Sequence, residues 1–148
     1  MLIAIDHGNK QVKTVHGNAI VSGVQKSKTR PYGRDVLKYG GSYYTLSAQR
    51  IPYQKDKTTD ERFFILSLFA IAEEIEAQNA YTSGLMPIDL SIGLPPAHFG
   101  VQNKAFVRYF KRKEPIYFSY RDKLYSILIR DVQCYPQAFA AAATMLGV

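Results

Sequence analysis

Short alternations of apolar and polar residues fill the first third of the chain, a pattern typical of strands joined by turns. The first strand, LIAID at residues 2–6, is mostly apolar and is expected to be buried on both faces. A polar turn is expected at residues 7–10, and a loop at residues 25–35, which contain a proline and a glycine. Three short strands are therefore expected, at residues 2–6, 12–17 and 18–24.

Two hairpins are indicated farther along the chain. In DVLKYGGSYYTLS, residues 35–47, two β-rich runs flank Gly40-Gly41, and glycines tolerate the positive φ angles of tight hairpin turns. Residues 115–136 contain a second pair of runs around Arg121-Asp122-Lys123. The second arm of this hairpin is expected to reach Pro136.

The strongest helix signal lies in residues 58–78, TTDERFFILSLFAIAEEIEAQ. Thr58 and Glu61 fit a capping box. The first half of this segment has almost no polar face, so the helix is expected to be buried on most sides. A helix of that kind needs covering layers, which favours a layered α/β structure.

The second half of the chain alternates strands and helices. Residues 87–94 are expected to form a strand that stops at Pro95-Pro96, followed by a rigid exit loop. An amphipathic helix is expected in residues 100–113, and a helix rich in small residues in residues 137–147. Three antiparallel strands followed by this alternation predict an α/β domain of ribonuclease-H-like layout, with a mixed sheet flanked by helices.

Composition is consistent with one globular domain spanning residues 1–148. Hydrophobic residues make up 47% of 148 residues, enough for a sizeable core. The single cysteine, Cys134, excludes an internal disulfide and fits a reducing compartment. We see no signal peptide and no run long enough to span a membrane, so a cytoplasmic protein is expected.

The net charge of +7 raises the question of an anionic partner. No segment is densely basic, and the closest is KRKE at residues 111–114. The stretch FVRYFKRK interleaves aromatic and basic residues, as nucleic-acid-binding surfaces do, but its Phe106 and Phe110 are needed for the core. A basic nucleic-acid-binding domain is therefore the least favoured of three hypotheses.

The opening hairpin carries the first candidate site. Asp6 ends a strand, Gly8 lies in the turn, and Lys13 begins the returning strand. Backbone N–H groups in such a turn suit a phosphate, Lys13 could reach the same anion, and Asp6 could hold Mg²⁺ through water. Ordinary hairpins with polar turns contain the same residue types, so the residues alone leave both interpretations open.

A second candidate is Gln137 in YPQAFAAAA, at a switch from strand to helix. Glutamine there could orient an attacking water, although a polar residue at a helix start is the more common explanation. The three histidines, His7, His16 and His98, lack partners at ligand spacing, so no zinc site is expected. A nuclease needs several carboxylates, and the strand end at Gly93 offers none.

Taken together, these stretches resemble a known family. IAIDHGNKQVKT resembles the first phosphate-binding hairpin of actin-like ATPases, and CYPQAFAAAATMLG resembles the strand and helix that carry their water-positioning glutamine. The stretches VLKYGGSYYTLSAQR, DERFFILSLFAIAEEI and IGLPPAHFG look like the first domain of the bacterial ParM-like plasmid-segregation proteins. The similarity extends over essentially the whole chain.

The resemblance implies a site and a function. Mg²⁺ and ATP would bind in a cleft between two domains, and subunits would polymerise into filaments that move plasmid DNA through a separate DNA-binding adaptor protein. Asp6 would be the catalytic and Mg²⁺-side acid, and Gln137 would place the hydrolytic water. The nucleotide would be held by Gly8, Asn9, Lys10, Gln11 and Lys13.

Members of that family are longer than 148 residues, so the second domain is expected to lie outside this sequence. The domain alone is expected to show little or no ATPase activity and to self-associate through apolar surface. The alternative is a standalone, non-catalytic actin-like module that binds or caps filaments. Neither direct DNA binding nor a membrane partner is expected.

Overall fold

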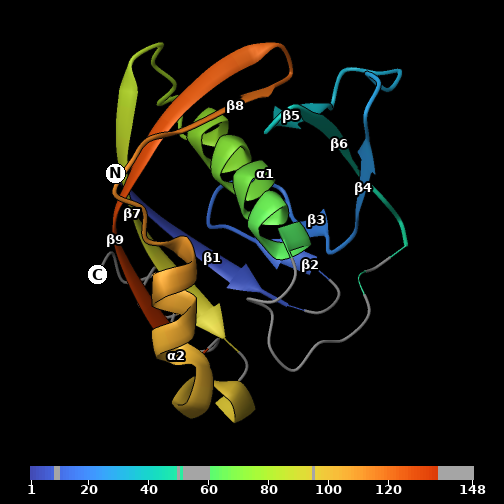
Figure 1. The fold of residues 1–148 in the computed structure, drawn as a ribbon. Coiled ribbons are helices and arrows are strands. Elements are labelled where there is room, and N and C mark those ends of the chain that lie inside the picture. Colours follow the sequence, from blue (N-terminus) through green and yellow to red (C-terminus); the bar gives the residue numbers. More distant parts are fainter. Residues whose placement is uncertain (9–10, 50, 52–60, 95, 137–148) are drawn as a thin grey trace.

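A computed structural model of the chain describes residues 1–8, 11–49, 51, 61–94 and 96–136. In these residues, strands form one mixed sheet and two helices pack against it (Figure 1). The helices are α1 (Glu61–Ala77) and α2 (Pro96–Phe110). The strands are β1 (Leu2–His7), β2 (Gln11–Lys13), β3 (Ile20–Val21), β4 (Val24–Ser27), β5 (Leu37–Tyr39), β6 (Ser42–Leu46), β7 (Leu85–Leu94), β8 (Ile116–Tyr120) and β9 (Lys123–Pro136).

The strand order is β3-β2-β1-β7-β9-β8-β5-β6-β4. The strands β1, β7 and β9 are parallel to one another, and the strands on either side of this group pair antiparallel. The sequence prediction of a mixed sheet with three antiparallel strands followed by parallel ones is thus confirmed. The parallel group brings the carboxyl ends of three strands to one edge of the molecule.

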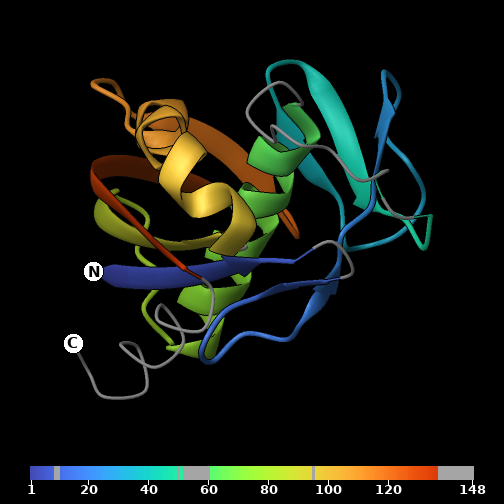
Figure 2. The ribbon, with the colours of Figure 1, turned by 90° about the horizontal axis from the view of Figure 1, so that it is seen from below.

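The helix α1 forms the centre of the core. Every residue from Phe63 to Ala72 is buried, as the nearly continuous apolar run predicts. The curved sheet encloses this helix: α1 contacts β1, β2 and β4, while Tyr120 of β8 packs edge-on against Phe69 at 5.3 Å (Figures 1 and 2). Strands from both ends of the chain therefore cover a single helix.

The second helix, α2, packs on the same face of the sheet as α1. The rings of Phe106 and Phe110 lie 6.4 and 5.7 Å from the ring of His7 in β1, and Phe110 stacks on Phe64 of α1 at 6.3 Å. The hydroxyl of Tyr109 accepts a hydrogen bond from the backbone N–H of Phe64, near the start of α1, at 3.2 Å. One of the unpaired N–H groups of the first helical turn thus gains a partner.

Burial along β1 differs from the expectation of a strand hidden on both faces. Ile3, Ile5 and His7 are buried toward the helices, while Leu2 is exposed and Asp6 is half-buried. The reason is that, in the part of the chain that the structure describes, both helices cover one face only. The opposite face of the sheet is where the polar end of β1 projects.

The strand boundaries also differ from the prediction in the first third of the chain. β2 has three residues, because residues 14–17 leave the sheet as a loop that contacts α1. Residues 25–27, predicted to lie in a loop, belong to β4, which pairs with β6 from Val24↔Leu46 to Ser27↔Tyr43. Exposed polar side chains at Gln25 and Lys26 hide this edge strand from pattern analysis.

Both predicted hairpins are confirmed. Gly40 and Gly41 have φ angles of 60° and 81°, and Arg121 and Asp122 turn between β8 and β9 with φ angles of 51° and 61°. The prediction of a rigid exit loop after β7 is wrong, because α2 begins at Pro96. Proline fits a first helical position, where its missing N–H costs nothing.

Candidate functional site

The candidate site is the hairpin of β1 and β2. Its register places Asp6 opposite Lys13 and His7 opposite Val12. The turn closes with a hydrogen bond from the backbone N–H of Gly8 to the carbonyl of Gln11, at 3.0 Å. A Cβ atom on Gly8 would lie 2.8 Å from that carbonyl oxygen, so the turn requires glycine.

Asp6 lies where parallel strands end. It pairs in register with Gly93 of β7, which in turn pairs with Tyr135 of β9. Lys13, Asp6, Gly93 and Tyr135 therefore form one row across four strands, and paired residues point to the same face of a sheet. Since the neighbouring Ile5 and His7 alternate toward the helices, this row lies on the face away from α1 and α2.

The structure brings together four of the predicted site residues. Asp6, Gly8, Gln11 and Lys13 lie within the hairpin, with Lys13 and Gln11 exposed and Asp6 half-buried. The predicted residues Asn9, Lys10 and Gln137 lie outside the described residues.

Sequence reasoning missed two members of the row. Gly93, which has no side chain, lies between Asp6 and Tyr135 in the row. Tyr135 carries a hydroxyl that donates to the side-chain oxygen of Gln133. The signal for both was available only through the register of β7 and β9, which no local pattern reveals.

Helix α1 holds the end of β1 through a buried hydrogen bond. The hydroxyl of Ser67 donates to the carbonyl of Phe63 at 2.9 Å, so its oxygen accepts from Nε2 of His7 at 3.1 Å. His7 is fully buried between this hydroxyl and the α2 rings. The residue beside Asp6 is thus fixed by both helices.

Helix α1 also contacts the chain just after β2. The side chain of Glu74 is 2% exposed, and Oε1 accepts the backbone N–H groups of His16 at 2.7 Å and Gly17 at 3.0 Å. Burial alone would raise the pKa of Glu74, but hydrogen bonds from Gln78 and His16 outweigh it and lower the pKa to about 2. The carboxylate is therefore charged at neutral pH.

A separate ion-pair network joins Glu73 and Glu76, which flank Glu74 on α1, to the β8–β9 turn. Arg121 lies 2.8 Å from Glu73, 3.0 Å from Glu76 and 2.7 Å from Asp35. The hydroxyl of Tyr125 donates to Glu76 at 2.9 Å. Burial and the adjacent carboxylate raise the pKa of this tyrosine. This network has a structural role, away from the row of Asp6.

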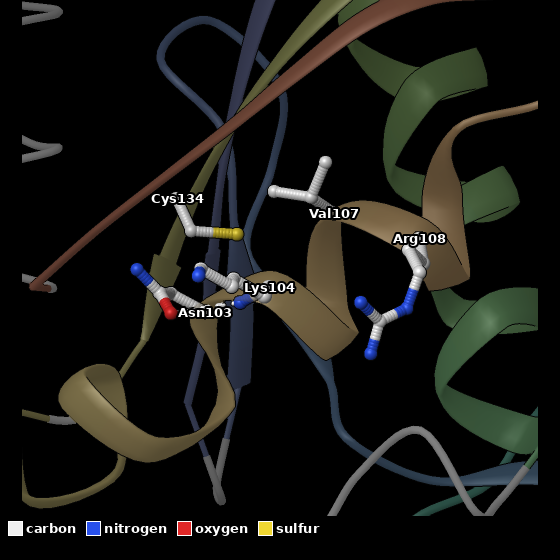
Figure 3. A pocket seen from close by; sticks show the side chains of 5 residues that line it. All are labelled: Asn103, Lys104, Val107, Arg108 and Cys134. Atoms are coloured by element: carbon white, nitrogen blue, oxygen red, sulfur yellow. Dashed lines mark hydrogen bonds between the residues drawn. The ribbon is translucent and has the colours of Figure 1, made fainter.

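A pocket of about 300 Å³ lies between α2 and β9 (Figure 3). It is lined by Asn103, Lys104, Val107 and Arg108 of α2 and by Cys134, whose side chain reaches from β9 toward the helix. Burial raises the pKa of the Cys134 thiol to about 11. Because Cys134 faces α2, this pocket lies on the other side of the sheet from Asp6.

The β1–β2 hairpin offers one carboxylate, Asp6, to a Mg²⁺ ion bound with a nucleotide. No group of three or more His, Cys, Asp or Glu side chains is placed to hold a metal among the residues with described positions. Mg²⁺ bound with a nucleotide keeps several waters and needs one or two carboxylates besides the phosphates. Asp6, with Lys13 opposite to meet phosphate charge, fits that requirement.

A family model matches most of the chain. Residues 4–139 match the model described as "Actin like proteins N terminal domain". A search of curated proteins finds no match. Neither helix of the described residues is long and apolar enough to cross a membrane.

Solved structures show the same fold. The apo pSK41 ParM protein is 14% identical with a TM-score of 0.71, covering 93% of this chain and 49% of that one. A filament of AlfA bound to AMPPNP is 13% identical with a TM-score of 0.69, covering 92% and 54%. Ta0583, an archaeal actin homologue in complex with ADP, is 14% identical with a TM-score of 0.64, covering 99% and 47%. The chain thus spans about half the length of these structures.

Proposed function

We propose that this chain, which belongs to the family of actin-like protein N-terminal domains, forms one side of a Mg-ATP cleft. The other side would come from a second domain outside these 148 residues. The complete protein would be a cytoplasmic ATPase that polymerises into filaments for plasmid DNA segregation. A separate DNA-binding adaptor protein would join the filament to its cargo.

The observation that carries the proposal is the row of Lys13, Asp6 and Gly93. Asp6 and Lys13 are register partners on two strands joined by a tight glycine turn, and Asp6 lies at the carboxyl ends of parallel strands. Ligands of open α/β sheets bind at such strand ends. Gly93 adds no side chain to this row, which suits a close approach of phosphates to the backbone.

Each hairpin residue has a proposed role. Lys13 contacts the phosphates, and Asp6 holds Mg²⁺ through water. The backbone of the turn, from Gly8 to Gln11, cradles the phosphates. Bound Mg²⁺ supplies charge neutralisation of the phosphates, and Gln137 positions the hydrolytic water.

Solved structures of the same fold also support the proposals of nucleotide binding and filament formation. The AlfA structure is a filament bound to AMPPNP, and the Ta0583 structure is a complex with ADP. AMPPNP is an ATP analogue, which favours ATP as the nucleotide.

Calorimetric titration of the full-length protein with ATP, with and without Mg²⁺, tests the proposal. We expect the affinity for ATP to fall at least tenfold in Lys13→Ala. In Asp6→Asn, adding Mg²⁺ should increase the affinity for ATP less than it does in wild type. The matched control is Lys26→Ala, an exposed lysine on β4, which should bind like wild type. Light scattering after ATP addition tests polymerisation in the same samples.

Two results would decide against this function. A full-length protein that binds no nucleotide and forms no filament favours the standalone binding or capping module. ATP binding that is equal in wild type and Lys13→Ala would separate the hairpin from the nucleotide site.

A further inference from the structure

We propose that Glu74 is a positioning residue of the β1–β2 hairpin: it holds the chain that follows Lys13 and so sets where Lys13 stands relative to a bound nucleotide. The inference rests on the proposed function, because the nucleotide is the proposed ligand of this hairpin. Glu74 lies on α1 and is separated from His16 by 58 positions in the sequence.

The strand that carries Lys13 is short, and Lys13 stands at its end. β2 spans three residues and pairs with β1 at Asp6↔Lys13 and His7↔Val12. On its other side it pairs with β3 at Gln11↔Val21 and Val12↔Ile20. Lys13 is the last residue of the strand, so its position depends on what the following residues bind.

Those following residues bind the Glu74 carboxylate. Oε1 accepts the backbone N–H groups of His16 and Gly17, at 2.7 and 3.0 Å, and Oε2 lies 2.7 Å from Nδ1 of His16. Gln78, one turn along α1, donates to the same carboxylate. Hydrogen bonds from N–H groups to a buried carboxylate are among the stronger ones in proteins.

The loop also lies close against the helix. A Cβ atom on Gly17 would lie 2.6 Å from Oγ1 of Thr14 and 3.4 Å from the backbone carbon of Glu73. Glycine therefore allows the loop to approach α1 closely enough for its N–H groups to reach Glu74.

Two points of α1 hold the two strands of the hairpin. Ser67 bonds His7, the residue after Asp6, and Glu74 bonds the loop that begins after Lys13. These side chains are seven residues apart, about two turns of helix, and so share a face. A rigid helix then fixes the separation of the strands that present Asp6 and Lys13.

The test is Glu74→Gln in the full-length protein, with Glu76→Gln as the matched control. Glutamine keeps the size of the side chain but removes its charge and one of its two acceptor oxygens, so its NH₂ group must face either the loop N–H groups or Gln78 and Nδ1 of His16. Glu76, two positions along α1, pairs with Arg121 and Tyr125 and not with the hairpin. We expect the Kd for Mg-ATP to rise at least tenfold in Glu74→Gln and to stay within twofold in Glu76→Gln.

Two further measurements separate positioning from general destabilisation. Amide exchange of residues 12–17, measured without nucleotide, should accelerate in Glu74→Gln and not in Glu76→Gln. In a Lys13→Ala background, adding Glu74→Gln should change the Kd less than twofold, because both changes act through Lys13. If Glu74→Gln does not fold, Gly17→Ala displaces the same loop with the carboxylate intact.

Specific outcomes overturn the proposal. Unchanged exchange of residues 12–17 in Glu74→Gln would show that the carboxylate does not hold the loop. An equal loss of affinity in Glu76→Gln, or full additivity with Lys13→Ala, would reduce Glu74 to a stabilising role. A wild-type protein that binds no nucleotide overturns the proposed function instead, while the exchange measurement still tests the contact.

Discussion

The carboxylate of Glu74 and the imidazole of His16 meet at 2.7 Å, with the carboxylate almost fully buried and the imidazole exposed. This contact joins α1 to the loop after β2. It also makes the stability of the domain depend on pH, because the charged form of Glu74 is the one that the folded protein stabilises.

The first prediction concerns acid stability. The pKa of Glu74 falls from 4.5 to about 2 on folding, so its contribution is complete above pH 4.5 and is lost as the pH falls toward 2. That shift corresponds to roughly 3 kcal/mol of unfolding free energy. Urea unfolding at pH 5, 4 and 3 should show this loss in wild type and a smaller pH dependence in Glu74→Gln. The exposed Glu114→Gln should follow wild type, and identical curves for all three proteins would contradict the prediction.

A second prediction concerns the ion-pair network of the β8–β9 turn. Arg121→Ala leaves the partly buried carboxylates of Glu73 and Glu76 without their guanidinium partner. The unfolding free energy should fall by about 1–3 kcal/mol. For comparison, Arg130→Ala removes an exposed pair with Asp89 and should cost less than about 1 kcal/mol. Chemical unfolding of both variants measures the difference, and equal losses would count against the network.

Cys134 provides a third prediction, on reactivity. Burial raises its thiol pKa from 9.0 to about 11, so the thiolate fraction at pH 8 should be on the order of a hundredfold lower than for an unperturbed thiol. Alkylation by iodoacetamide, followed by mass spectrometry, should be correspondingly slow in the folded protein. The same protein in denaturant is the control, and rapid labelling before unfolding would show that the thiol is activated.

The fourth prediction concerns the turn glycine. In Gly8→Ala the new methyl group would lie 2.8 Å from the carbonyl oxygen of Gln11, so the turn must open. We expect a loss of about 1–3 kcal/mol in stability and weaker Mg-ATP binding. Gly84→Ala is the matched control, because a Cβ atom there meets nothing within 4 Å. Thermal unfolding and nucleotide titration of the two variants test both parts. A Gly8→Ala protein as stable as Gly84→Ala would show that the turn tolerates a side chain.

Local patterns predicted the elements that carry their own signal. The apolar run of α1 and the glycine pair at Gly40-Gly41 are visible in a short window, and both predictions are confirmed. β4 has no such signal, because Gln25 and Lys26 are exposed and the strand exists only through its pairing with β6. The two prolines after β7 predict a rigid exit loop, but proline is also well suited to begin a helix, and α2 begins at Pro96.

The residues of the candidate site also differ in whether a local sequence pattern could predict them. Asp6, Gly8 and Lys13 lie within eight residues of one another, so the sequence alone could place them on one hairpin. Tyr135 joins their row only through the register of two parallel pairings. The contact of Glu74 with the loop spans 58 positions and depends on tertiary packing, which no periodicity encodes.

The enclosure of α1 by strands from both ends of the chain has a consequence for synthesis. The helix leaves the ribosome before β7, β8 and β9 exist, with its apolar sides still uncovered by those strands. The pairing of β1 with β7 joins residues such as Leu2 and Asp89 that are far apart in sequence, and contacts of that kind form late and slowly. Newly made chains should therefore pass through an aggregation-prone interval, which ends only when the last strands close over the helix.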